Sequence, residues 1–369
     1  MRLIISGGGT AGHVSPALAI VDALRAAAEL DVHYVGTSSG LEADLVPRAG
    51  LPFTGIAGGG IVGKGFGQAL TGAAFATQGL GQALAVLRRF RPHAVVGTGG
   101  YVSGPVVFAA AMLRIPALIQ EQNVFPGVTN RLLSPLVAAV AVPFPEAAAH
   151  FPRVARRRLL VTGNPVREAV LRATRAAGRE AFGLDEGRPV VYVTGGSRGA
   201  PAINEAAARA LPALLAVGTQ VIWSTGKDRQ ARAMDQYRQA GGDPGHPGLR
   251  AFPYIYQPEL AMAAADLAVS RAGAATVAEL TCRGLPSVLI PSPHVAHDHQ
   301  QFNAEVLERS GAAQVVRESC LEGTGLAQLI RGLLDNGRRL QAMSVAARGL
   351  GCPKAADDIA RAVLSLARR

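Results

Sequence analysis

Short apolar runs recur along the chain, and turn residues follow each of them. Because these runs are apolar throughout instead of alternating, they predict strands buried on both faces of a parallel sheet. Longer amphipathic stretches with helical spacing lie between them. The predicted strands cover 3–6, 32–35, 53–57, 93–98, 117–120, 137–142 and 159–163, then 190–194, 220–224, 249–255, 266–270, 287–291 and 313–316. The alternation predicts an α/β protein with Rossmann-like halves.

The strand–helix pattern starts again after the segment GNPVR at 163–167. We expect a hinge there, between an N-terminal domain 1–163 and a C-terminal domain 164–352. A chain of 369 residues is long enough for two cores. Pro353 begins a last helix, 353–369, which we expect to pack back on the first domain. The carboxyl edges of the two sheets are expected to face each other across a cleft.

The stretch at 265–286, ADLAVSRAGAATVAELTCRGLP, predicts a strand, a turn at Gly273 and a helix over 274–283. A helix reached through small residues presents free N–H groups and a partial positive charge, which suit a diphosphate. Glu279 could then accept hydrogen bonds from ribose hydroxyls. The alternative is an ordinary crossover unit, but similar glycine turns follow several other predicted strands.

The first of these turns contains Gly7, Gly9 and Gly12, which match the dinucleotide pattern G-x-G-x-x-G. A nicotinamide-dependent oxidoreductase is therefore an alternative. The next strand, however, ends in Gly-Thr-Ser-Ser at 36–39 and lacks the acidic residue that holds the ribose of such a cofactor. His13 directly follows the glycines, at the sheet edge where α/β proteins bind ligands. Ser15 and Pro16 predict the start of the next helix.

Polar residues gather after the strand at 117–120: Glu121, Gln122, Asn123 and Asn130. Amides and carboxylates at such an edge suit sugar hydroxyls, and loop capping is the alternative. His294, His297 and His299 lie near Asp298, but their spacing fits no zinc pattern. No Asp-x-Asp pair is present. We therefore expect no metal, with a leaving diphosphate stabilised by helix ends and cations.

The net charge of +11 and the isoelectric point of about 10.4 predict an anionic partner. Aromatic residues make up only 5% and do not alternate with basic runs, so base stacking on nucleic acid is disfavoured. Glycines and apolar residues surround Lys64 in the segment 58–67, which suits either an anionic lipid surface or a mobile loop.

The cysteines, Cys282, Cys320 and Cys352, are odd in number and lack metal or redox spacing, which suggests a reducing compartment. The apolar run at the N-terminus is too short for a signal peptide. No uninterrupted apolar run reaches the roughly 18 residues of a membrane span. We expect a soluble or peripheral protein on the cytosolic side.

Seven segments, in this order, resemble the bacterial MurG glycosyltransferases: GGGTAGHVSPALA at 7–19, GTGGYVSGP at 97–105, EQNVFPGVTN at 121–130, GNPVR at 163–167, GGSRGA at 195–200, SRAGAATVAEL at 270–280 and HDHQQFNA at 297–304. The resemblance implies the GT-B fold. It also implies inverting transfer of N-acetylglucosamine from its UDP conjugate to the 4-hydroxyl of the N-acetylmuramoyl unit of lipid I, which gives lipid II. The family works at the cytoplasmic face of the cell membrane as a peripheral protein.

Carried over by position, the resemblance implies a donor site of Thr10, Ala11, Gly12, Asn123, Arg167, Ser197, Ile255, Ala274, Ala275, Thr276, Val277, Ala278, Glu279, Gln300 and Gln301. His13 or Glu121 is the implied base. Tyr101, Ser103 and Asn130 lie on the acceptor side. Anionic lipid and cell-wall or division proteins are further expected partners, and no cofactor is expected. The segment between Pro291 and Gln300 is about two residues longer than usual, by comparison with the family's spacing. A transferase for another lipid acceptor, such as diacylglycerol, and a non-enzymatic membrane adaptor are the remaining alternatives.

Overall fold

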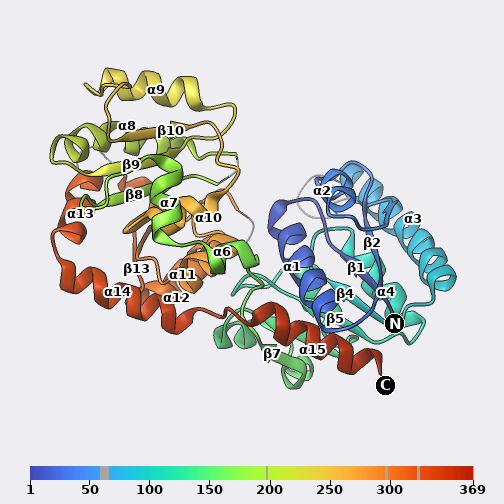
Figure 1. Ribbon diagram of the computed structural model, residues 1–369. Helices are drawn as coiled ribbons and strands as arrows, with labels where there is room; N and C mark the ends of the chain where they lie inside the picture. Colours follow the sequence, from blue (N-terminus) through green and yellow to red (C-terminus); the bar gives the residue numbers. More distant parts are fainter. Residues whose placement is uncertain (59–65, 197, 296–297, 322–324, 369) are drawn as a thin grey trace. The chain divides into compact units, whose positions relative to one another are not determined.

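The computed structural model describes residues 1–58, 66–196, 198–295, 298–321 and 325–368. The chain forms two compact units: Met1–Arg167 together with Cys352–Arg369, and Glu168–Gly351 (Figure 1). The first unit therefore extends four residues beyond Gly163. Asn164 is anchored there because its side chain accepts a hydrogen bond from Gln120 Nε2 (2.9 Å) and donates one to the Gln122 carbonyl (2.8 Å).

The first unit is a parallel sheet of order β3-β2-β1-β4-β5-β6-β7. Its elements are β1 Arg2–Ser6, α1 Ala11–Ala27, β2 Asp31–Thr37, α2 Glu42–Arg48, β3 Phe53–Ile56, α3 Phe66–Phe90, β4 Ala94–Gly97, α4 Ser103–Met112, β5 Ala117–Gln120, α5 Val128–Leu133, β6 Ala139–Val142, the 3-10 helices η1 Pro145–His150 and η2 Arg153–Arg158, β7 Leu159–Val161 and α15 Ala355–Ala367. The chain reverses its direction of travel between β1 and β4. This switch point is where doubly wound sheets bind ligands.

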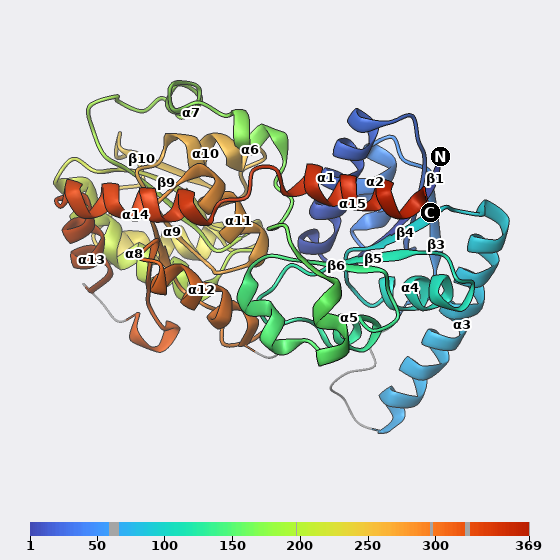
Figure 2. The ribbon, with the colours of Figure 1, turned by 90° about the horizontal axis from the view of Figure 1, so that it is seen from below.

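Side chains alternate across β1 and build two cores, one on each face of this sheet. Leu3 and Ile5 belong to the core that contains α1 and α15, whereas Ile4 belongs to the core that contains α4. Helix α15 lies against α1 (Figure 2), with Ile359 and Val363 fully buried. Each such side chain stabilises the fold by about 1.5–3 kcal/mol, so the C-terminal helix is an integral part of the first unit.

The second unit is a parallel sheet of order β10-β9-β8-β11-β12-β13, with its switch point between β8 and β11. Its elements are α6 Glu168–Arg172, α7 Arg175–Phe182, β8 Val190–Thr194, α8 Pro201–Ala216, β9 Gln220–Ser224, α9 Gln230–Gln239, β10 Leu249–Phe252, α10 Pro258–Ala264, β11 Leu267–Ser270, α11 Ala274–Arg283, β12 Ser287–Leu289, α12 His299–Arg309, β13 Ala313–Val315, the 3-10 helix η4 Glu318–Cys320, α13 Gly325–Leu334 and α14 Gly337–Leu350. The prediction of two doubly wound halves is confirmed.

Several strand boundaries differ from the sequence-based prediction by one to three residues, and two boundary differences bear on the site. Helix α1 begins at Ala11, not at Ser15, because the carbonyl of Thr10 already accepts hydrogen bonds from the N–H groups of His13 (3.1 Å) and Val14 (3.3 Å). Pro16 therefore lies inside the helix, where it lacks an N–H to donate. Strand β10 ends at Phe252, so Ile255 lies in the segment that leads to α10.

Candidate functional site

Two glycine loops meet at the switch point of the first sheet. The loop after β1 contacts the loop after β4, and the Gly8 N–H donates to the Gly99 carbonyl (3.3 Å). Gly99 and Gly100 have φ values of 98° and 81°. A Cβ at Gly100 would lie 2.3 Å from the Gly8 oxygen. Both the left-handed backbone and the close approach require glycine here.

His13 lies beside this contact, and its hydrogen bonds determine its tautomer. Its Nδ1 is 2.9 Å from the Gly8 carbonyl oxygen and 3.1 Å from the Thr10 hydroxyl. A carbonyl oxygen can only accept, so Nδ1 carries a proton, and in the neutral ring Nε2 is then the basic nitrogen. A Cβ at Gly99 would lie 3.1 Å from Nε2. The ring is therefore positioned with a basic nitrogen at the carboxyl edge of the sheet.

Glu42 holds the first glycine loop in place, and the sequence analysis missed it. Its side chain is fully buried, and it accepts hydrogen bonds from Gly9 N–H (2.9 Å), Thr37 N–H (2.9 Å) and the Thr37 hydroxyl (2.6 Å). Burial alone would raise the pKa of Glu42, but the hydrogen bonds from Thr37 and Gly9 outweigh it and hold the pKa below its ordinary value of 4.5. The sequence did contain a signal for this role, because Glu42 is an acidic residue in the first turn of the helix that follows β2.

Glu42→Gln is expected to destabilise the chain by about 1–3 kcal/mol near neutral pH, because the new amide turns an N–H toward donors that need an acceptor. The folded-state pKa of Glu42 is depressed, so its contribution is present above about 4.5 and is lost as the pH falls through the folded value. Urea unfolding of both proteins across this range measures the effect. A stability difference that stays constant with pH would contradict it.

Glu121 is the centre of a second buried cluster, and its side chain is 2% exposed. One carboxylate oxygen accepts from the Asn123 N–H (2.9 Å) and side-chain amide (3.3 Å). The other accepts from the Gly127 N–H (3.0 Å) and the Asn130 amide (2.7 Å). These four bonds favour a role in holding the loop between β5 and α5 over a role as base.

Gln122 joins this loop to the neighbouring strand end. Its amide donates to the Thr98 carbonyl (2.6 Å), and the Thr98 hydroxyl donates to the His13 carbonyl (2.9 Å). Gln122, Thr98 and Gln120 are all buried. The ends of β1, β4 and β5 are thus tied into one polar network.

Only one of the three acceptor-side residues presents its side chain to solvent. Tyr101 is 57% exposed. Ser103 is 2% exposed, and its hydroxyl donates to the Gly100 carbonyl (3.4 Å), so it closes the turn before α4. Asn130 is buried against Glu121. The placement of the three residues on the acceptor side stays a prediction, and Tyr101 is the one whose side chain could reach a bound acceptor.

Glycine-containing loops also follow the two strands at the switch point of the second sheet. Thr194 and Ser270 are register partners, so the loops after β8 and β11 start side by side. In the loop after β8, Gly199 has a φ of 67°, and a Cβ there would lie 2.0 Å from the Thr225 oxygen. The Gly196 N–H donates to the Thr194 hydroxyl (3.1 Å). Ser197, expected to contact the diphosphate, lies outside the described residues.

The N-terminus of α11 follows β11 through Gly273, whose carbonyl accepts from Val277 N–H (2.9 Å). Among the residues that the structure describes, no side chain caps this end. The first turn, 274–276, is partly exposed and offers backbone N–H groups to an anion. Val277 and Ala278 are buried, so a donor contact from either residue would come through its backbone and stays a prediction.

Glu279 is partly exposed on α11. Its charge acts on Tyr192 of β8, whose pKa is raised to about 12, chiefly by burial and further by Glu279. Glu279 lies about one helical turn beyond the first turn of α11. Ile255 is buried, whereas the next residue, Tyr256, is exposed. On the other side of Ile255, the ring centroid of Tyr254 lies 5.1 Å from Lys227 Nζ. The uracil contact of Ile255 stays a prediction.

The remaining residues expected in the donor site differ in their hydrogen bonds and in their exposure to solvent. Gln300 Oε1 accepts from Ser292 N–H (2.9 Å), and Gln301 donates to Glu305 (3.0 Å). Thr10 is exposed, and Gly12, Asn123 and Arg167 are partly exposed, whereas the side chain of Ala11 is not described.

His294 is 82% exposed, and its Nε2 is 4.0 Å from a Glu318 oxygen. His297 lies outside the described residues. Within the described part of the chain, no group of three histidine, cysteine or acidic residues could hold a metal.

Two doubly wound units with glycine loops at their switch points define the GT-B class of glycosyltransferases. The N-terminal domain model of glycosyltransferase family 28 matches residues 3–142, and its C-terminal domain model matches residues 190–359. The crystal structure of MurG from Acinetobacter baumannii matches with a TM-score of 0.77 at 29% identity, covering 99% of each chain.

Curated relatives match over the full length. Proteins of Symbiobacterium thermophilum (46% identical, covering 100% of this chain and 97% of the relative) and Moorella thermoacetica (45%, 99% and 98%) are named UDP-N-acetylglucosamine–N-acetylmuramyl-(pentapeptide) pyrophosphoryl-undecaprenol N-acetylglucosamine transferase. The chain belongs to glycosyltransferase family 28, in its MurG group.

Proposed function

We propose that this chain transfers N-acetylglucosamine from UDP-N-acetylglucosamine to the 4-hydroxyl of the N-acetylmuramoyl unit of lipid I. The observation that carries the proposal is the full-length identity of 46% to a transferase of that name. Two features support it: His13 has a basic nitrogen at one switch point, and the uncapped α11 lies at the other.

The proposed reaction is a single displacement with inversion. The acceptor oxygen forms a bond to the anomeric carbon of the donor sugar while the bond from that carbon to the diphosphate oxygen breaks. Nε2 of His13 takes the hydroxyl proton, and UDP leaves with the electron pair. Backbone N–H groups in the first turn of α11 stabilise the charge on the diphosphate.

Incubation of the purified chain with radiolabelled UDP-N-acetylglucosamine and a lipid I analogue tests the proposal. Label in the polyprenyl-linked product and release of UDP support it. Label in diacylglycerol instead would favour the rival acceptor. No transfer to either acceptor from a folded protein that binds UDP would overturn it.

The oxidoreductase alternative lacks the group that it requires. Strand β2 ends at Thr37, whose N–H and hydroxyl both donate to Glu42. The second oxygen of that carboxylate accepts from Gly9. The carboxylate is therefore engaged within the protein, whereas a nicotinamide cofactor needs an acidic side chain that faces its ribose.

Glu279→Ala is expected to raise the KM for UDP-N-acetylglucosamine about 10-fold with a smaller change in kcat, since a charged hydrogen bond to the ribose would be lost. Initial rates at varied donor concentration measure this. Glu205→Ala removes an exposed carboxylate paired with Arg209 on α8 and serves as the control. An unchanged donor KM would place the ribose elsewhere.

We propose that the first unit associates peripherally with anionic lipid of the cytoplasmic membrane face. No described helix is long and apolar enough to cross a membrane. Leu132 and Leu136 are exposed, and Arg158 of η2 donates to the Val137 carbonyl (2.9 Å), which places basic and apolar side chains together. The loop 58–67 falls largely outside the described residues.

Sedimentation of the protein with anionic vesicles tests this proposal. Binding that weakens as salt is added would support it, and no binding to the vesicles would contradict it. Contacts with cell-wall or division proteins stay a prediction.

A further inference from the structure

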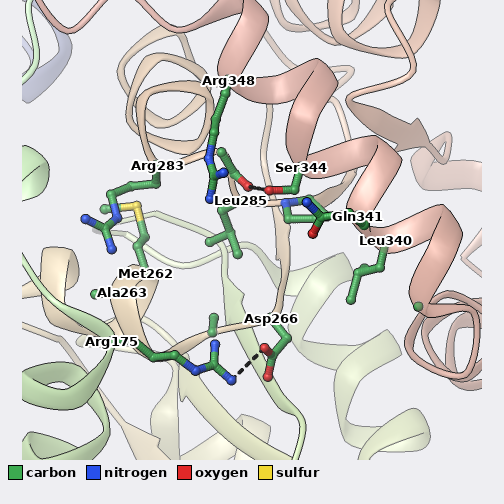
Figure 3. A pocket seen from close by; sticks show the side chains of 14 residues that line it. Arg175, Met262, Ala263, Asp266, Arg283, Leu285, Leu340, Gln341, Ser344 and Arg348 are labelled. Atoms are coloured by element: carbon green, nitrogen blue, oxygen red, sulfur yellow. Dashed lines mark hydrogen bonds and ion pairs between the residues drawn. The ribbon is translucent and has the colours of Figure 1, made fainter.

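A cavity of about 330 Å³ opens in the second unit, at the opposite edge of the sheet from the glycine loops (Figure 3). Asp266 comes immediately before β11, and Leu285 and Pro286 come immediately before β12. These residues line the cavity at the amino ends of the strands. The switch-point loops lie at the carboxyl ends, so the cavity is separate from the proposed donor site.

One face of α14 forms a wall of the cavity. Gly337, Gln341, Ser344 and Arg348 line it, at the spacing that places residues on one side of a helix. Figure 3 shows Arg348 and Arg175 entering from opposite sides of the opening. An apolar surface formed by Met262, Leu285 and Leu340 completes the lining.

The lining carries more positive than negative charge. It contains three arginines, Arg175, Arg283 and Arg348, and one carboxylate, that of Asp266. Asp266 accepts from Arg175 Nη2 at 2.8 Å, from Arg179 Nη2 at 3.2 Å and from the Val190 N–H at 2.8 Å. Two arginines therefore already share the carboxylate of Asp266. The positive charges of Arg283 and Arg348 have no carboxylate of their own in the lining.

Two of the α14 side chains that line the cavity have no protein partner in the described part of the chain. The Arg348 guanidinium and the Gln341 amide make no hydrogen bond or ion pair there, and both residues are exposed at the opening. Gly284, with a φ of 62°, gives room to Arg348, because a Cβ at this position would lie 2.3 Å from Arg348 Cγ. Gly284 ends α11 in a left-handed turn that other residues adopt with strain.

Arg283 is less accessible, and its Nε is buried without a partner among the described atoms. Its Nη1 donates to the carbonyls of Val170 (3.3 Å) and Ala173 (2.6 Å). Burial, and then the charge of Arg348, lower its pKa. Two like charges at one cavity repel each other, and an anion between them would relieve this repulsion.

We propose that this cavity binds a small phosphate-bearing anion, with Arg348 and Arg175 as its charged ligands. Gln341 and the Ser344 hydroxyl, which donates to the Gly284 carbonyl at 2.7 Å and keeps its lone pairs, supply further polar contacts. The apolar surface accommodates an organic substituent on the phosphate. A guanidinium matches phosphate oxygens in geometry and charge. A soluble phosphate ester and a phospholipid headgroup share this chemistry.

Calorimetric titration of the full chain with pyrophosphate tests the proposal, in saturating UDP so that the donor site is occupied. We expect one further site in the wild type and binding about 10-fold weaker in Arg348→Met, since a charged hydrogen bond is lost. Gln341→Leu is expected to weaken binding less. Arg338→Met, on the same helix but outside the lining, is the matched control and should bind as the wild type does.

A parallel sedimentation with phosphatidylglycerol vesicles distinguishes the two sources. Pyrophosphate binding that depends on Arg348 identifies a soluble phosphate. Vesicle binding that depends on Arg348, without pyrophosphate binding, identifies a lipid headgroup. If Arg348→Met binds both probes as the wild type does, or if neither probe binds, the proposal is wrong. Because neither readout requires glycosyl transfer, its failure is distinct from failure of the proposed function.

Discussion

His13→Ala is expected to lower kcat by about 100-fold or more, because it removes the proposed base for the proton of the acceptor hydroxyl. The contact of Nδ1–H with the Gly8 carbonyl fixes the tautomer, so the proposed base is already oriented in the protein. Steady-state rates with the donor and a lipid I analogue measure kcat, and calorimetry with UDP measures donor-site binding. We expect UDP affinity to stay close to that of the wild type.

His93→Ala provides the matched control. His93 is exposed, and its Nδ1 accepts from the Arg2 N–H (3.0 Å) at the amino end of the first sheet, opposite the glycine loops. This variant should keep the wild-type rate, since water can replace the lost acceptor. Near-normal turnover in His13→Ala would remove His13 from the role of base.

Glu121→Ala is expected to destabilise the chain by about 3 kcal/mol and to lower activity strongly. Four donors on Asn123, Gly127 and Asn130 lose their acceptor inside a buried cluster. Donors left unsatisfied cost about 1–3 kcal/mol each, although such costs do not add fully. Urea unfolding measures the stability, and the same assay as above measures the rate.

Glu121→Gln separates a positioning role from a role as base. It keeps the shape and one acceptor oxygen, so a positioning residue should retain part of its rate with an unchanged pH profile. If Glu121 is the base, the variant should lose nearly all activity, together with one limb of the pH profile.

Glu168→Ala is the control for the stability measurement. It removes an exposed carboxylate paired with Arg172 and should alter stability by no more than about 0.5 kcal/mol. A stable Glu121→Ala protein would contradict the buried cluster.

The sequence predicted the framework closely because strands buried on both faces are encoded locally. The strands β8 and β9 have the same bounds as their apolar runs, 190–194 and 220–224. The predicted start of α1 was wrong, although Ser15 and Pro16 form a valid local start signal. The helix begins before them because the N–H groups of His13 and Val14 already donate to the Thr10 carbonyl. The Glu42 cluster was missed because its donors come from two separate segments, the loop after β1 and the end of β2.

By itself, the sequence determined the two doubly wound sheets, the glycine turns at their edges and the residue types available there. Only the tertiary structure decided which of those side chains are accessible. Glu42 meets Gly9 across 33 residues of chain, and Ser103 and Val277, both placed in the site from the sequence, are buried. A hydrogen-bond partner or a covering side chain can come from any distant segment, so local patterns specify the elements, and folding specifies their neighbours.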